Sequence, residues 1–187
     1  ADFDTDRGQE AIPLMHDGVL YVSTAWSMVK AYDARNGKLK WSYDPKVPKE
    51  TLARACCDAV NRGVALYGDK VYVATLDARL YALDANSGAV LWQADTADGS
   101  GRGINSTGAP EVAGSVVVIG NGGAEYDVRG YVSAYDLESG KLVWRFHTVP
   151  RDPKLGAQDH PDLDTAVKTW DADSRWDIGG GGTPWDA

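Results

Sequence analysis

The sequence predicts an all-β fold, a β-propeller made of four-stranded blades that dock onto one another through tryptophans. One phrase, Asp-x3-Gly-x3-Trp, recurs three times, at intervals of 51 residues (33 to 84) and then 52 residues (84 to 136). Its members are Asp33, Gly37 and Trp41, then Asp84, Gly88 and Trp92, then Asp136, Gly140 and Trp144. A repeat of about 50 residues made of strand-like segments is typical of one propeller blade.

Each phrase has the features of a β-hairpin. Alternating apolar residues flank a turn in which the aspartate can cap its own backbone and the glycine can adopt a positive φ. A second short apolar strand precedes each phrase and is introduced by a turn glycine, at residues 18–22, 68–73 and 114–118. We therefore expect repeats at about residues 8–50, 51–100 and 101–150, with each tryptophan packed between neighbouring sheets.

Composition excludes several classes of protein. The chain has 187 residues, with 21 glycines, seven tryptophans and nine tyrosines, which suits a β-rich domain with a real core. No stretch of 18 consecutive apolar residues occurs, so no transmembrane segment is expected. A net charge of −8 without a basic run argues against nucleic acid as a partner. Because the chain begins at Ala1 without Met, we expect a processed form or a fragment.

The two cysteines of the chain, Cys56 and Cys57, are adjacent. Consecutive Cα atoms are about 3.8 Å apart, which is below the usual disulfide range of about 4.4–6.8 Å, so a bond between them would be strained. Spacing alone allows two buried free thiols as well as a disulfide that serves a site. The pair precedes the strands of the second repeat, in a loop where a propeller would present groups to its central axis.

Three segments, residues 54–65, 119–131 and 179–185, resemble the pyrroloquinoline quinone (PQQ)-dependent alcohol dehydrogenases, the quinoprotein methanol and ethanol dehydrogenases. They read Arg-Ala-Cys-Cys-Asp-Ala-Val-Asn-Arg-Gly-Val-Ala, Ile-Gly-Asn-Gly-Gly-Ala-Glu-Tyr-Asp-Val-Arg-Gly-Tyr and Gly-Gly-Gly-Gly-Thr-Pro-Trp. The resemblance runs from Gly8 to the last residue. It implies an eight-bladed propeller with PQQ and a calcium ion, or a lanthanide, on its axis. About three blades and the start of a fourth, at residues 179–187, would be present here.

The resemblance also assigns roles to individual residues. Cys56 and Cys57 would form the vicinal disulfide that lies on one face of the quinone, and Trp185 would cover the other face. The alternative for Trp185 is another blade-docking tryptophan, but it follows the glycine run and lacks the Asp, Gly and Trp phrase upstream, which favours the site. Without the family, Glu10 would be read as a solvated carboxylate near the start of the chain. The full set of expected cofactor-binding residues is Glu10, Cys56, Cys57, Arg62, Thr107, Gly122, Gly123, Ala124, Thr183 and Trp185.

Glu125 is the candidate metal ligand. A hard dication prefers carboxylate and carbonyl oxygens, and a glutamate directly after a tight glycine loop can point inward. The alternative is an ordinary surface glutamate. The glycine run at residues 179–182 is a weak signal by itself, because a flexible linker has the same composition.

No catalytic residue is expected within this chain. In the family, the Asp that acts as general base and an Asn that binds the metal lie beyond the motif that ends at Trp185. We therefore expect a fragment of a periplasmic enzyme that oxidises primary alcohols to aldehydes and passes electrons to cytochrome c, and that is inactive without the remaining blades. Residues 148–178 depart from the repeat and resemble an inserted loop near the substrate entrance.

Two other functions remain open from the sequence. One is a non-catalytic propeller of the same repeat type that serves as a scaffold or binding module. Such a protein would share the Asp, Gly and Trp phrase but would have no reason to keep the three family segments together. The other is a quinoprotein dehydrogenase that acts on sugars or polyols.

Overall fold

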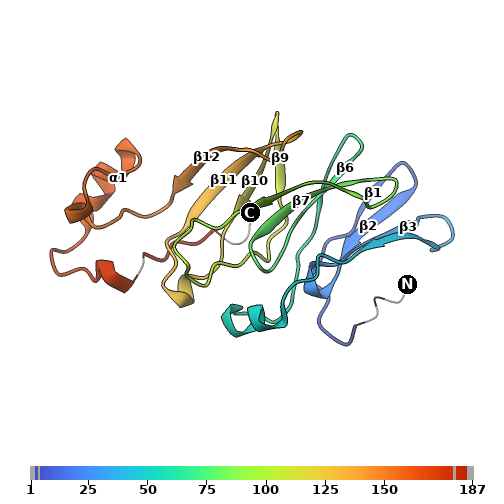
Figure 1. The fold of residues 1–187 in the computed structure, drawn as a ribbon, viewed down its shortest axis with the longest axis horizontal. Helices are drawn as coiled ribbons and strands as arrows, with labels where there is room; N and C mark the ends of the chain where they lie inside the picture. Colours follow the sequence, from blue (N-terminus) through green and yellow to red (C-terminus); the bar gives the residue numbers. More distant parts are fainter. Residues whose placement is uncertain (1–2, 4, 179, 185–187) are drawn as a thin grey trace.

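Three antiparallel sheets of four strands each lie side by side in chain order (Figure 1). The structure is a computed structural model, and it describes residues 3, 5–178 and 180–184. The first sheet contains β1 (Leu14–His16), β2 (Val19–Ser23), β3 (Val29–Asp33) and β4 (Leu39–Tyr43). The second contains β5 (Ala65–Tyr67), β6 (Lys70–Ala74), β7 (Arg79–Asp84) and β8 (Val90–Asp95). The third contains β9 (Glu111–Ala113), β10 (Val116–Gly120), β11 (Tyr131–Asp136) and β12 (Leu142–His147).

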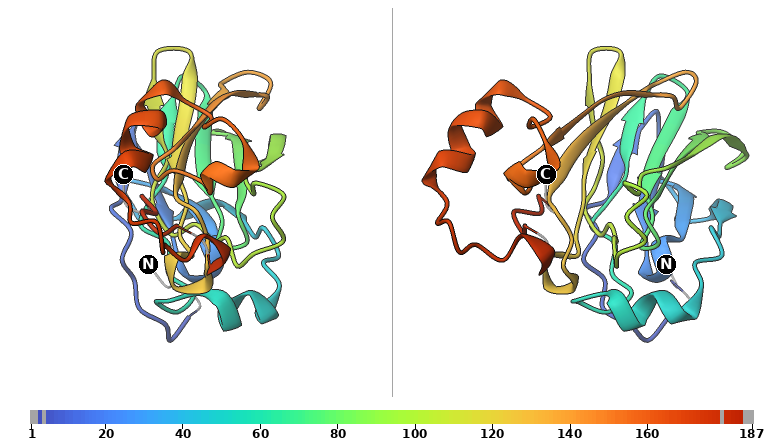
Figure 2. Two further views of the ribbon diagram at one scale, coloured as in Figure 1. Left: turned by 90° about the vertical axis from the view of Figure 1, so that its left-hand side faces the viewer. Right: turned by 60° about the vertical axis from the view of Figure 1, so that its left-hand side comes forward.

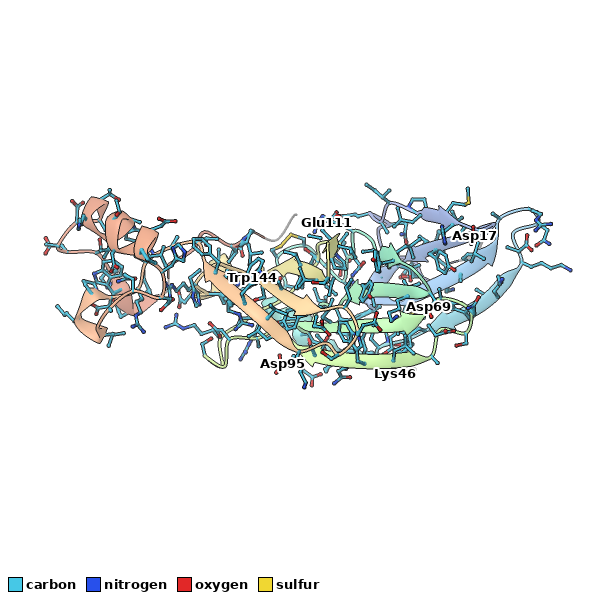
Figure 3. All side chains as sticks on the ribbon, turned by 90° about the horizontal axis from the view of Figure 1, so that it is seen from above. Asp17, Lys46, Asp69, Asp95, Glu111 and Trp144 are labelled. Atoms are coloured by element: carbon cyan, nitrogen blue, oxygen red, sulfur yellow. A yellow bond between two sulfur atoms is a disulfide. The ribbon has the colours of Figure 1, made fainter. Side chains whose placement is uncertain are left out.

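Each sheet is one blade, with its strands in sequence order from the first to the fourth. This confirms the predicted fold class, while the residue limits proposed for the repeats and for the inserted loop stay predictions. The second and third blades meet along their first strands, because β5 contacts β9. Figure 3 shows the two long edges of the stack, with Asp17 and Glu111 at one edge and Lys46 and Asp95 at the other.

Short 3-10 helices gather at one end of the blades, the lower end in Figure 1. They are η1 (Ala25–Ser27), η2 (Lys49–Arg54) and η3 (Ala124–Tyr126). These helices lie in the connections from β2 to β3, from β4 to β5 and from β10 to β11. The connection after η2 carries the two cysteines, and η3 carries Glu125, so this end of the blades holds two of the segments expected to bind the cofactor.

The repeated phrase forms the interface between blades. The indole nitrogen of Trp41 donates a hydrogen bond to the carbonyl oxygen of Ala85, in the β7–β8 turn of the next blade, at 2.9 Å. Trp92 donates in the same way to the carbonyl of Leu137, also at 2.9 Å. The expectation that each tryptophan packs between neighbouring sheets is therefore confirmed for Trp41 and Trp92. A tyrosine of the same blade, Tyr21 in the first case, donates to the same carbonyl at 3.2 Å.

The turn glycines are required for two reasons. Gly88 and Gly140 have φ values of +73° and +67°, as the turn predicts. In addition, a Cβ atom on Gly88 would lie 2.6 Å from the ring of Trp41, and one on Gly140 would lie 2.5 Å from the ring of Trp92. Gly37 has the same φ region, +71°, but no heavy atom would approach its Cβ within 4 Å among the described residues. The first blade thus presents the same docking turn without a tryptophan on it.

The outer flank of the third blade carries a tryptophan on which, among the described residues, no turn is docked. Trp144 is 44% exposed, whereas Trp41 is 8% exposed.

Each blade has a β-bulge between its third and fourth strands, next to the tryptophan. The register shifts lie at Ala31/Tyr32, Ala82/Leu83 and Ala134/Tyr135. A β-bulge changes the direction in which a side chain points, and here it recurs beside all three tryptophans.

Beyond β12 the chain leaves the blades. It forms η4 (Pro153–Leu155), the α-helix α1 (Pro161–Ala166), η5 (Val167–Thr169) and η6 (Trp176–Ile178). These elements lie outside the third blade, and Figure 2 shows them projecting from the stack of sheets. Trp170 and Trp176 stack with their ring centroids 5.2 Å apart. Within the part of the chain that the structure describes, no helix is long and apolar enough to cross a membrane.

We predict that Gly88→Ala destabilises the chain more than Gly37→Ala, although both substitutions place alanine at the same turn position with the same φ. The strain of positive φ costs each variant about 1–3 kcal/mol. Only the alanine at position 88 also displaces a docked indole, which adds roughly 1–3 kcal/mol of overpacking. Guanidinium unfolding monitored by tryptophan fluorescence measures the difference. Equal losses would contradict the docking role of this glycine.

Candidate cofactor site

Arg62 joins the first three blades at the centre of the candidate site. Its side chain donates to the hydroxyl of Thr107 at 2.5 Å, and its guanidinium lies 3.0 Å from the carboxylate of Glu10. Arg62 precedes β5, Thr107 precedes β9, and Glu10 precedes β1. Thr107 is buried, and a guanidinium held by a hydroxyl and a carboxylate has a fixed orientation. The structure therefore brings together three of the expected cofactor-binding residues.

Backbone hydrogen bonds hold the same three segments in register. The amide of Arg62 donates to the carbonyl of Thr107 at 2.9 Å, and the amide of Ile12 donates to the carbonyl of Arg62 at 3.1 Å. An open groove of about 520 Å³ runs along the first strands of the blades from this point. Its lining includes Arg62, Leu14, Ala65 and Val112. Arg62 thus lies at a groove whose walls include the first strands of the blades.

Cys56 and Cys57 form a disulfide bond, as the resemblance implies. Cys56 is exposed and Cys57 is half-buried. The loop that follows is tied to the N-terminal segment, because Asp58 pairs with Arg7 and the guanidinium of Arg7 lies 5.2 Å above the ring of Trp26. The amide of Trp26 also donates to the carbonyl of Ala59 at 2.8 Å. The loop next to the disulfide is therefore held by contacts to the N-terminal segment and to the first blade.

Two glycines of the third blade lie against the segment that leads to Thr107. The amide of Gly122 donates to the carbonyl of Asn105 at 2.8 Å. A Cβ on Gly122 would overlap the side-chain oxygen of Asn105, and one on Gly123 would lie 2.5 Å from the carbonyl of Gly103. Asn105 donates in turn to the carbonyl of Arg54 at 2.8 Å, two residues before the disulfide. Small residues are required here because backbones approach closely.

Glu125, the expected metal ligand, lies in η3 and is exposed, as is Ala124. It lines an open pocket of about 360 Å³ together with Arg54, Arg102 and Asp127. Among the described residues, no three His, Cys, Asp or Glu side chains are grouped as a metal site. Glu125 could thus supply one oxygen ligand, and the described contacts do not join it to Arg62, Thr107 or Glu10.

The glycine run crosses the third blade before it reaches Thr183. The carbonyl of Gly181 accepts from the amide of Gly130 at 2.8 Å, and the carbonyl of Gly182 accepts from the hydroxyl of Thr148 at 2.6 Å. Thr183 is half-buried. Trp185, expected on the second face of the quinone, lies outside the described residues.

A cluster of charged side chains lies beside the glycine run. Asp159, from the segment after η4, accepts a hydrogen bond from Arg129 at 2.8 Å and lies 2.7 Å from the Nδ1 atom of His147. Burial lowers the pKa of His147, and the charge of Arg129 lowers it further. Burial by itself would raise the pKa of Asp159, but the hydrogen bond and charge of Arg129 and the charge of His147 hold it below its usual value. Arg129 and Asp159 thus form a stable ion pair at neutral pH.

Sequence reasoning missed several residues that organise the site. Asn105 lies two residues before Thr107, and it is buried against Gly122, where no side chain fits. Arg7, Asp58 and Thr148 act through contacts between segments far apart in the sequence. No local pattern could have indicated these contacts, because each depends on how two blades or loops are placed relative to one another.

The fold and these segments define a class of protein. Residues 2–177 match the family model described as the glucose/ethanol/alcohol dehydrogenase β-propeller domain with PQQ, and the chain belongs to this family. The resemblance stated from the three motifs is therefore confirmed.

Several individual proteins are similar to this chain. The chain is 58% identical, over its full length, to the quinohemoprotein alcohol dehydrogenase ADH IIB of Pseudomonas putida, of which it covers 27%. It is 52% identical to the crystal structure of the quinohemoprotein alcohol dehydrogenase ADHIIG of Pseudomonas putida HK5, with a TM-score of 0.95 over 99% of this chain and 27% of that one. A europium-containing methanol dehydrogenase is 36% identical, with a TM-score of 0.81 over 96% of this chain and 32% of that one. The chain thus spans about a quarter of the length of the quinohemoproteins that it matches.

We predict that an alkylating reagent leaves both cysteines unmodified in the native chain and modifies both after reduction. Once reduced, the exposed Cys56 and the half-buried Cys57 are both accessible to the reagent. The chain has two cysteines, so intact mass reports this pair alone. Two modified thiols in unreduced protein would contradict the disulfide.

Proposed function

We propose that this chain is part of a periplasmic PQQ-dependent alcohol dehydrogenase and forms about half of its cofactor site. The observation that carries the proposal is the placement of Glu10 and Thr107, from the segments that lead into two other blades, within hydrogen-bonding distance of Arg62. A scaffold propeller needs the docking tryptophans but does not need a guanidinium held at the rim of the axial groove.

The donor set fits the chemistry of PQQ. The cofactor is a planar tricarboxylate with two quinone oxygens, and an arginine fork is suited to bind such oxygens. The hydroxyl of Thr107 provides a further polar group, and Glu10 holds the orientation of the guanidinium. Gly122 and Gly123 pack so closely on the segment before β9 that no side chain fits there, and this packing fixes the loop that leads to Glu125. The fit therefore rests on charge and on hydrogen-bond donors.

Each residue of this chain would have a separate task in the reaction. Bound PQQ supplies the two-electron acceptor, and a bound metal ion supplies Lewis acidity. The Cys56–Cys57 disulfide and Trp185 would confine the ring from its two faces and exclude water. Arg62 would stay close to the quinone oxygens and stabilise negative charge there when the cofactor is reduced. The hydroxyls of Thr107 and Thr183 would orient the cofactor through its polar edge.

Glu125 would hold the metal ion with one carboxylate. Calcium and lanthanide ions both prefer oxygen ligands, and a site of this kind needs several of them. We propose calcium or a lanthanide, the latter because a europium-containing methanol dehydrogenase shares this part of the fold. The remaining ligands and the general base would come from the other blades of the complete protein.

The substrate class and partners follow from the relatives. Those at 58% and 52% identity are named quinohemoprotein alcohol dehydrogenases, which favours primary alcohols over sugars or polyols as substrates. Cytochrome c is the proposed electron acceptor. The periplasm is the proposed location, because a disulfide persists in an oxidising compartment.

We predict that the complete protein, reconstituted with PQQ and calcium, oxidises a primary alcohol in a dye-linked assay, and that this chain alone does not. Glu125→Gln should lower the calcium-dependent rate more than about tenfold, because loss of even an indirect contact to a metal typically costs 10- to 100-fold. Glu138→Gln is the control, since Glu138 is an exposed residue of the β11–β12 turn. Alcohol oxidation by the isolated chain, or equal rates for the two variants, would count against the proposal.

A further inference from the structure

The segment that leads to Thr183 lies in a groove made by three separate parts of the third blade. Gly120 ends β10, Gly130 precedes β11, and Thr148 follows β12. Arg129 and Gly181 form a parallel β-bridge, so the crossing segment pairs with the blade through its backbone. The segment therefore has a defined register on the blade before it reaches the cofactor site.

The two glycines on the blade have no local reason to be glycine. Neither Gly120 nor Gly130 has a positive φ, so alanine would suit the backbone at both positions. A Cβ on Gly120 would overlap the carbonyl of Pro184, and a Cβ on Gly130 would overlap the carbonyl of Gly182. The crossing segment, and not a turn, is what excludes a side chain at these positions.

Gly120 and Gly130 also lie at the two ends of a connection that carries other residues of the candidate site. Residues 121–129 connect Gly120 to Gly130, and this connection carries Gly122, Gly123 and the proposed metal ligand Glu125. Because the crossing segment touches both ends of the connection, its position and that of the glycine loop are linked through two short backbone contacts. A shift of one segment would move the other.

One side chain fixes the crossing segment along its length. The amide of Thr148 donates a hydrogen bond to the carbonyl of Gly130 at 2.9 Å, and its hydroxyl donates to the carbonyl of Gly182 at 2.6 Å. Val149, the next residue, packs on the crossing segment, because a Cβ on Gly180 or Gly182 would lie 2.5 Å or 2.7 Å from its methyl groups. Arg129 holds the carbonyl of Val149 at 2.8 Å while it pairs with Asp159.

We propose that Thr148 is a positioning residue for the cofactor site, and that Gly120 and Gly130 provide the clearance it depends on. The hydroxyl of Thr148 sets the place of Gly182, and Gly182 is followed directly by Thr183, whose hydroxyl would bind PQQ. This inference rests on the proposed function. It adds that the distance between the two cofactor-holding segments is set by the third blade and not by the cofactor.

The test compares Thr148→Val with Thr148→Ser in the complete protein, prepared without cofactor and titrated with PQQ. Valine keeps the shape of threonine but removes the donor, whereas serine keeps the donor. Thr169→Val is the matched control, because Thr169 also donates its hydroxyl to a backbone carbonyl, that of Ala166, at 2.8 Å, away from the site. The readouts are the dissociation constant for PQQ and the melting temperature of the cofactor-free protein.

We expect Thr148→Val to raise the dissociation constant for PQQ about five- to tenfold, the loss typical of one hydrogen bond. Thr148→Ser should restore most of the affinity, and the two valine variants should melt at similar temperatures without PQQ. Gly130→Ala should weaken PQQ binding further, whereas Gly8→Ala should not, because within the described part of the chain no heavy atom lies within 4 Å of a Cβ at Gly8.

The outcomes separate this inference from the proposed function. Equal dissociation constants for Thr148→Val and Thr169→Val would overturn the positioning role while leaving the proposed function in place. A lower affinity matched by an equal loss in the serine variant would also overturn it, since the hydroxyl would then not be the cause. If the unsubstituted protein binds no PQQ, the proposed function fails, and this inference fails with it.

Discussion

The docking of a tryptophan onto the glycine turn of the next blade is the contact on which the rest of the structure depends. It combines a hydrogen bond from the indole to a turn carbonyl with close packing on a residue that has no side chain. Because the same contact recurs at equivalent positions of each blade, it orients successive blades in the same way. The segments before β1, β5 and β9 consequently arrive at one place, where Glu10, Arg62 and Thr107 meet.

The candidate site is built from connections and not from strands. Its groups come from loops at the ends of the blades, and backbone hydrogen bonds between these loops hold them, as between Arg62 and Thr107. This division is typical of proteins that place functional groups on loops supported by a rigid scaffold. The scaffold here also excludes side chains, since Gly122 and Gly123 are enclosed by the segment before β9. This close packing of glycine on the neighbouring segment makes the loops of the site rigid.

The third blade contributes more to the site than its own loop. It holds the glycine run through Thr148, Gly120 and Gly130, and it holds the segment after η4 through the pair of Arg129 and Asp159. These two sets of contacts are adjacent, because Arg129 also donates to the carbonyl of Val149, the residue next to Thr148. The third blade therefore connects the segment after η4 to the glycine run.

The sequence by itself determined the propeller blades, the repeated tryptophan position and the identity of most candidate cofactor residues, because repeats and motifs are local patterns that a single chain displays. It also determined the positive φ of Gly88, since a turn of this type requires it. Only the tertiary structure decided that Trp41 lies on Gly88, that Asn105 encloses Gly122, and that Gly120 and Gly130 are glycine because another segment passes over them. These reasons depend on the distance between atoms that are far apart in the sequence, and no periodicity or motif encodes that distance.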